Sequence, residues 1–204
     1  SSLHIGCHLL RCVSCLREHA TELGTLFCEN DVTHLEKKDG YFTATLEDHT
    51  ELQARSVIYA AGTSYRRLEI AGGRLAGVSY CATCDGAFYQ GKVVAVIGGG
   101  DTALEDALYL SRMAKTVYLV HRRDTFRANA ALQEAVQKTE NIVLVTNAVP
   151  TEITGEKRVE TLKLLQGGSP KEFSLDGVFV AIGSVPNTSL LEDVAELDSS
   201  GYVQ

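Results

Sequence analysis

The spacing of hydrophobic residues changes along the chain, and each change predicts a different kind of element. Residues 16–23 place Leu16, Ala20 and Leu23 on one face, which is typical of the end of an amphipathic helix. Short extended runs bounded by polar turns follow at residues 25–30, 32–38, 41–46 and 51–54. We expect these runs to form a β-meander, followed by an apolar strand at 56–60 that stops at Ala61-Gly62-Thr63.

From residue 92 onwards the pattern becomes an alternation of strands and helices. Residues 92–97 are almost continuously apolar, as expected for a buried parallel strand. Residues 102–114 repeat apolar side chains at the helical period, and 116–120, 128–138 and 142–145 follow as strand, helix and strand. A second meander is expected at 159–165, 173–175 and 178–182, with a turn at 167–170. The alternation predicts an α/β fold, a Rossmann-like three-layer domain that carries a β-meander.

Composition narrows the functional classes. The 204 residues carry a net charge of −7, which argues against nonspecific nucleic-acid binding because that requires a basic surface. No apolar run reaches the ~20 residues that a membrane-spanning helix needs, and the first residues do not resemble a signal peptide. The six cysteines fit a reducing cytoplasm and one catalytic pair better than a secreted disulfide scaffold.

A glycine-rich turn lies between the strand expected at 92–97 and the helix expected at 102–114. Its sequence is Gly98-Gly99-Gly100-Asp101-Thr102-Ala103, which fits the pattern of a dinucleotide-binding turn. In such a turn the first glycine permits a tight bend, the second admits the pyrophosphate, and the small third residue allows the helix to pack closely. The alternative is a glycine turn that binds no ligand, which the strand–turn–helix context disfavours.

Basic residues occupy the end of the next predicted strand. An NAD site usually places an acidic residue there, about 20 residues after the glycines, to hold the ribose hydroxyls. This chain instead has His121, Arg122 and Arg123, with Arg127 about one turn later. Guanidinium groups bind a phosphate dianion, so the cluster favours NADPH over NADH. A solvated basic patch is the alternative.

Two cysteines precede the glycine turn, at the spacing of a redox-active pair. Cys81 and Cys84 are three residues apart and are followed directly by Asp85, an acid that can exchange a proton during thiol–disulfide exchange. A zinc site would need two further ligands, and Cys7, Cys12 and Cys15 are far away in the sequence. The pattern therefore favours redox chemistry over metal binding or a chance pair.

Four segments together resemble a known family. They are the cysteine segment 78–88, the glycine turn with its preceding strand at 96–103, the basic segment 121–128, and residues 181–188. In this combination the chain is similar to the low-molecular-weight thioredoxin reductases from about Leu16 to Gln204.

The resemblance implies a thioredoxin-disulfide reductase. Electrons would pass from NADPH through FAD to the Cys81–Cys84 disulfide and then to thioredoxin. Cys84 would face the flavin, Cys81 would attack the thioredoxin disulfide, and Asp85 would handle the proton. The NADPH domain would rotate against the FAD domain between steps, and the intact protein would be a homodimer.

The resemblance also assigns cofactor-binding residues. Glu105 joins the glycine turn and the basic cluster at the NADPH site. Near FAD are expected Val32, Ala60, Ala61, Gly62, Ile182 and Gly183. Ala61 stands where the family more usually has threonine.

Two departures from the family affect the expected domain organisation. The chain has no second GxGxxG turn for the flavin phosphates, and it stops before the Gly-Asp motif with which the family ends. We therefore expect part of an FAD-binding domain at 1–63, an NADPH-binding domain at 64–183, and a truncated return to the FAD domain at 184–204. One alternative function is an incomplete NADPH-binding fragment without turnover. Another is a reductase for a peroxiredoxin-type partner, which Ala82-Thr83 between the cysteines disfavours.

Residues 1–15 do not resemble the family. His4, Cys7, His8, Cys12 and Cys15 suggest a metal knuckle, but we expect a foreign or misread leader rather than a zinc site.

Overall fold

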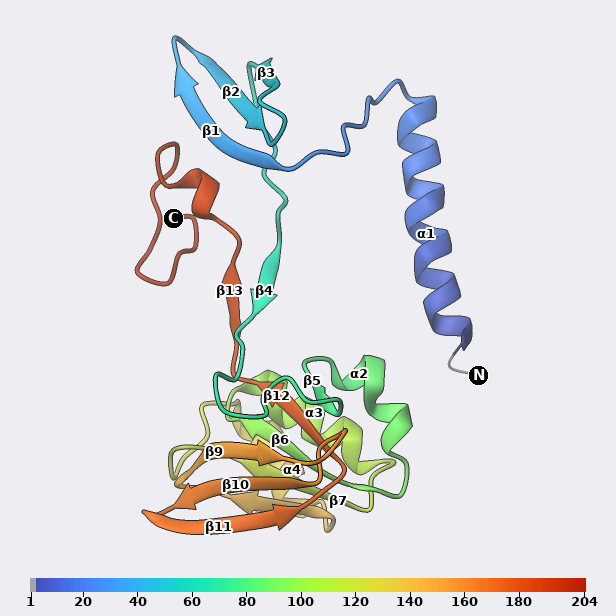
Figure 1. Ribbon diagram of the computed structural model, residues 1–204, viewed down its shortest axis with the longest axis vertical. Coiled ribbons are helices and arrows are strands. Elements are labelled where there is room, and N and C mark those ends of the chain that lie inside the picture. Colours follow the sequence, from blue (N-terminus) through green and yellow to red (C-terminus); the bar gives the residue numbers. More distant parts are fainter. Residues whose placement is uncertain (1–2) are drawn as a thin grey trace. The chain divides into compact units, whose positions relative to one another are not determined.

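The computed structural model describes the backbone of residues 3–204 and the side chains from residue 13 onwards. The chain forms two compact units (Figure 1). One contains the residues up to Thr63 together with Pro186–Gln204, and the other contains Ser64–Val185. The boundaries lie within two short paired strands, β4 (Thr63–Tyr65) and β13 (Ser184–Pro186).

The first unit begins with helix α1 (Leu3–Glu22) and continues into an antiparallel meander. The meander consists of β1 (Val32–Lys38), β2 (Tyr41–Leu46) and β3 (Glu51–Ala54), with the bounds that the sequence predicts. Asp39 and Gly40 both have positive φ and form the β1–β2 turn. The meander buries Leu35 and Leu46, and a short 3₁₀ helix, η2 (Ser189–Leu191), buries Leu191.

Two strands expected in this unit are absent. Residues 25–30 and 56–60 are irregular, so both predictions were wrong. Neither segment packs its apolar side chains into a core, since Leu26 and Ile58 are each 95% exposed. A strand requires a neighbour for its backbone hydrogen bonds, and apolar composition alone does not supply one.

The second unit is built on a five-stranded parallel sheet in the order β5-β12-β6-β7-β8. Its strands are β5 (Val78–Ser79), β6 (Val93–Gly98), β7 (Thr116–Val120), β8 (Ile142–Val145) and β12 (Gly177–Ala181). Helices α3 (Asp101–Ser111) and α4 (Ala130–Lys138) connect successive strands. Strands β6, β7 and β8 and helices α3 and α4 match the predicted alternation to within two residues at most ends, whereas β5 was not predicted.

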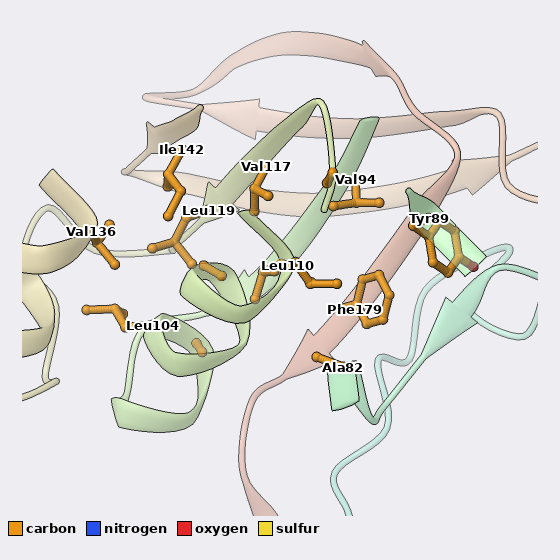
Figure 2. Close-up of a cluster of buried hydrophobic side chains, with 14 of the residues drawn as sticks. Ala82, Tyr89, Val94, Leu104, Leu110, Val117, Leu119, Val136, Ile142 and Phe179 are labelled. Atoms are coloured by element: carbon orange, nitrogen blue, oxygen red, sulfur yellow. The ribbon is translucent and has the colours of Figure 1, made fainter. Parts of the chain in front are cut away.

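Alternate residues of the central strands divide the core between two faces. Val94 and Val96 pack with Leu104 and Leu110 of α3, and Figure 2 shows this cluster extending to Phe179. Ala95 and Ile97 point to the opposite face and pack with residues of a second antiparallel meander. The unit is therefore a three-layer α/β structure of Rossmann type, as predicted.

The second meander differs from the prediction in its membership. It consists of β9 (Ala148–Thr154), β10 (Thr161–Gln166) and β11 (Ser169–Ser174), with β9 at one edge. Residues 178–182 were expected in this meander, but they form β12 of the parallel sheet instead. Strand β9 was not predicted from the sequence. It contains Pro150, which lies opposite Leu164 beside a register shift. Proline suits such an edge position, so its presence did not rule out a strand.

In the described part of the chain, no helix is both long and apolar enough to cross a membrane.

Candidate redox and dinucleotide-binding site

The Cys81–Cys84 pair is closed as a disulfide at the start of a short helix. The two Cα atoms are 5.3 Å apart, and Cys81 is the N-cap of α2 (Ala82–Asp85). The Cys84 backbone N–H donates to the Cys81 sulfur over 3.2 Å. After reduction this N–H would stabilise a thiolate at Cys81, because a hydrogen bond to the charged form favours that form. Cys84 is exposed, while Cys81 is half-buried.

The Asp85 carboxylate, beside the disulfide, is held by Ser79, a residue that the sequence did not mark as functional. Asp85 is half-buried, and its Oδ2 accepts a 2.7 Å hydrogen bond from the hydroxyl of buried Ser79. The same hydroxyl accepts from the Cys81 backbone N–H over 3.1 Å. Ser79 ends β5, two residues before the first cysteine, and its position in the sequence gave no sign of this contact.

Close packing holds the disulfide segment against the rest of the second unit. Ala82 is buried, and a Cβ at Gly86 would lie only 3.0 Å from the Tyr109 ring and 3.1 Å from Leu110 Cδ2 of α3. Another 3₁₀ helix, η1 (Gly86–Tyr89), then places the Tyr89 ring 5.1 Å from that of Phe179. Burial, followed by the negative charge of Asp85, raises the pKa of Tyr89, so this phenol remains protonated.

The glycines of the turn have different structural roles. A Cβ at Gly98 would lie 2.3 Å from the Ala181 carbonyl O and 2.7 Å from Ala103 Cβ, so this glycine allows α3 to approach the sheet. Gly100 is the N-cap of α3, and a Cβ there would meet nothing within 4 Å. The turn thus presents open backbone at a helix N-terminus, where phosphate groups bind. Gly98 and Ala103 together allow α3 to pack closely against the sheet.

His121 lies beneath this turn rather than at the exposed basic edge. A Cβ at Gly99 would lie 2.2 Å from its ring, which also stacks on Phe126 at 5.2 Å. Its Nε2 is 3.1 Å from the Thr125 carbonyl O. Burial is the main cause that lowers the pKa of His121, and the neighbouring arginines lower it further. His121 is therefore a neutral packing residue at neutral pH.

The three arginines of the cluster are exposed, and hydrogen bonds hold their loop against the glycine turn. The Arg127 backbone N donates to the Gly99 carbonyl over 2.8 Å. Asp101 Oδ1 accepts from the backbone N and side-chain Nδ2 of Asn129, at 2.8 and 3.1 Å. Asp101 thus ties the two loops together, while Thr102 and Glu105 are exposed on α3. These bonds fix where Arg122, Arg123 and Arg127 leave the backbone.

The residues expected near a flavin are divided between the two units. Val32 and Ala60–Gly62 belong to the first unit, and Ile182 and Gly183 belong to the second. In the first unit, Asn187 donates to the Ala61 and Gly62 carbonyl oxygens, each over 3.0 Å. The structure therefore does not bring these residues together in one site within either unit.

Within residues 13–204 no cluster of three histidine, cysteine or acidic side chains could hold a metal ion. Cys15 and Cys28 are exposed free thiols. The side chains of His4, Cys7, His8 and Cys12 lie outside the described residues, so the structure does not address a metal knuckle there.

Comparison with known proteins identifies the family. Residues 12–204 match the model of the pyridine nucleotide-disulphide oxidoreductases. The chain belongs to this family.

Individual relatives carry thioredoxin reductase names. The chain is 42% identical over 195 residues to the bifunctional thioredoxin reductase/thioredoxin of Mycobacterium leprae, covering 92% of this chain and 42% of that protein. It is 41% identical to the thioredoxin reductase of Treponema pallidum, covering 92% of this chain and 62% of that protein. Among solved structures, the thioredoxin reductase of Lactococcus lactis in its FR conformation superposes with a TM-score of 0.76 at 36% identity, covering 85% of this chain and 59% of that one. The chain therefore spans roughly half the length of such relatives.

Proposed function

We propose that this chain carries the disulfide and NADPH sites of a thioredoxin-disulfide reductase that uses FAD as its second cofactor. The observation that carries the proposal is a closed Cys81–Cys84 disulfide in the same compact unit as an open glycine turn edged by arginines. The names of the relatives support thioredoxin as the partner.

NADPH fits the residues of the second unit. Gly100 leaves room for the pyrophosphate at the N-terminus of α3, and the exposed arginines supply positive charge for the additional phosphate. We assign cofactor contacts to the turn at 98–103, to Glu105, and to Arg122, Arg123 and Arg127. His121 would act by packing under the turn.

When bound, NADPH supplies a hydride and FAD serves as the carrier through which its two electrons reach the disulfide. Reduction of the disulfide consumes two electrons and two protons, and Asp85 is the proposed proton-exchanging group. We propose that Cys81 attacks the partner disulfide, since the Cys84 N–H favours a thiolate at Cys81. Cys84 would then close the ring and release the reduced partner.

The remaining assignments extend this proposal to the whole protein. Residues 64–183 would form the NADPH-binding domain, while 1–63 and 184–204 would contribute to FAD binding through Val32, Ala60, Ala61 and Gly62, with Ile182 and Gly183 at the return. We also propose a homodimer and a cytoplasmic location, where thiols remain reduced.

The test is an absorbance experiment on the purified chain. After incubation with FAD and desalting, a retained flavin band that bleaches with NADPH, followed by reduction of added thioredoxin, is the expected result. Cys84→Ser should abolish thioredoxin reduction and leave the bleaching intact. Flavin loss accompanied by NADPH binding would instead favour an NADPH-binding chain without turnover.

Cofactor choice has its own test by calorimetry. Arg122→Ala should weaken NADPH binding by about tenfold or more and leave NADH binding nearly unchanged, because only NADPH carries the additional phosphate. Arg74→Ala, which removes an exposed arginine elsewhere in the unit, is the matched control. Equal losses for both cofactors in Arg122→Ala would contradict the assignment.

A further inference from the structure

Ser79 is a buried serine whose hydroxyl lies between the first cysteine and the carboxylate that follows the second. Its side chain is 6% exposed, and its Oγ is 2.7 Å from Asp85 Oδ2. The same Oγ is 3.3 Å from the Cys81 carbonyl O and 3.1 Å from the Cys81 backbone N. One oxygen atom therefore joins both ends of the disulfide segment.

The hydroxyl has one proton and two acceptors within reach. While Asp85 is ionised, its charge makes it the stronger acceptor, and the hydroxyl donates to it. Once Asp85 is protonated, the carboxyl becomes a donor to the hydroxyl oxygen. The hydroxyl proton can then turn to the Cys81 carbonyl, and the Cys81 N–H keeps its acceptor throughout. In both arrangements the hydroxyl, the carboxyl and the Cys81 N–H each have a hydrogen-bond partner, so the network can exist in two states.

We propose that Ser79 is a positioning residue that links the protonation state of Asp85 to the backbone of Cys81. The hydroxyl donates to the ionised carboxylate, and it rotates when that carboxylate is protonated, so it keeps hydrogen-bond partners in both states. Because Ser79 is buried, water cannot readily substitute for the hydroxyl. The inference rests on the proposed function in one respect, namely that Asp85 exchanges a proton with the dithiol.

The link can be tested without either cofactor, because the reduced dithiol reacts with glutathione disulfide. One cysteine thiolate attacks the reagent and expels a glutathione thiolate. The second cysteine thiolate attacks the resulting mixed disulfide, closes the ring and expels the other glutathione. Two electrons pass from the dithiol to glutathione, and the two thiol protons leave with the products.

The experiment measures the rate of this oxidation at neutral pH in the full chain. Cys7, Cys12, Cys15 and Cys28 are replaced by serine, so that only the Cys81–Cys84 pair reacts. Ser79→Ala should slow this oxidation by about tenfold, because the Asp85 carboxylate loses the charge-assisted donor that holds it beside the dithiol. Ser174→Ala, an exposed serine at the end of β11, should match the unsubstituted protein.

A double-mutant cycle separates this role from a merely structural one. Asp85→Asn should also slow the oxidation, and adding Ser79→Ala to Asp85→Asn should slow it no further. An unchanged rate in Ser79→Ala, or an additional loss in the double variant, would overturn the proposal. Ser79→Thr retains the hydroxyl and should keep the rate of the unsubstituted protein, which also serves as the test if Ser79→Ala does not fold. A tenfold loss in Ser79→Thr would refute the link. Failure of NADPH or FAD to bind does not affect this assay, so it would count against the proposed function alone.

Discussion

The two units of this chain differ in how they use hydrophobic residues. The second unit holds both hydrophobic clusters, with side chains such as Leu104, Leu162 and Phe179 fully buried. Among the described residues of the first unit, the buried apolar side chains are Leu35, Leu46 and Leu191. Several of its other large apolar side chains are exposed, including Leu26 and Ile58.

This difference indicates where the stability of the chain resides. Burial of apolar surface is the main favourable contribution to folding, so the second unit should dominate the unfolding free energy. The disulfide and the glycine turn both lie on that unit and take their geometry from its packing. The first unit contributes a meander with local turns and little core of its own.

The largest effect should come from the core of the second unit. Phe179→Ala should lower the unfolding free energy by about 3–5 kcal/mol, because a fully buried ring would leave a cavity between β12 and Tyr89. Urea unfolding followed by circular dichroism measures this loss. Ile58→Ala, at an exposed site of the first unit, should stay within about 0.5 kcal/mol. Comparable losses in both variants would show that the two units do not differ in how much their buried side chains contribute to stability.

Glycine substitutions test the same difference between the two units, with a smaller expected loss of stability. Gly98→Ala should cost about 1–3 kcal/mol and also weaken NADPH binding, because the new methyl group would collide with the Ala181 carbonyl and Ala103. Gly40→Ala in the first unit meets no neighbour and should cost only about 1 kcal/mol, from its positive φ. Thermal unfolding and calorimetry with NADPH would measure both. A smaller loss in Gly98→Ala than in Gly40→Ala would contradict the packing argument.

The carboxylate of Asp106 gives the smallest and most specific prediction, and Asp48 in the first unit provides the contrast. Burial, followed by repulsion from Glu105, raises the pKa of Asp106 on α3 to about 6, whereas hydrogen bonds from Thr50 lower the pKa of exposed Asp48 in the first unit. The native state therefore binds the Asp106 proton more tightly than the unfolded chain does. Its contribution to the unfolding free energy is present below about pH 4 and is lost as the pH rises to about 6.

Asp106→Asn removes this pH dependence. At pH 7 the variant should be more stable by about 1–2 kcal/mol, a value reduced from the full shift because the carboxylate is only half-buried. At pH 4 the gain should disappear. Glu140→Gln removes a charge from an exposed position and should change stability little at either pH. Equal gains for Asp106→Asn at both pH values would show that its charge is not the cause.

Local patterns were enough to predict much of this fold. The bounds of β1, β2, β3, β7 and β8 follow from the sequence, as do the glycine turn at the start of α3 and the pairing of Cys81 with Cys84. Each of these features depends on residues close together in the chain, whose spacing and turn chemistry are directly readable.

Tertiary packing decided the rest. It placed β12 between β5 and β6, although the sequence of β12 also suited a meander. The pairing of strands that are far apart in the chain depends on how much side-chain surface each arrangement buries, and the local pattern does not encode this. It also buried His121 beneath Gly99 and brought the Ser79 hydroxyl to Asp85. The amino-acid sequence sets which chemical groups are present in the site. The packing of β5, α2 and the sheet sets which of these groups meet, because their contacts depend on distances between elements that no local spacing encodes.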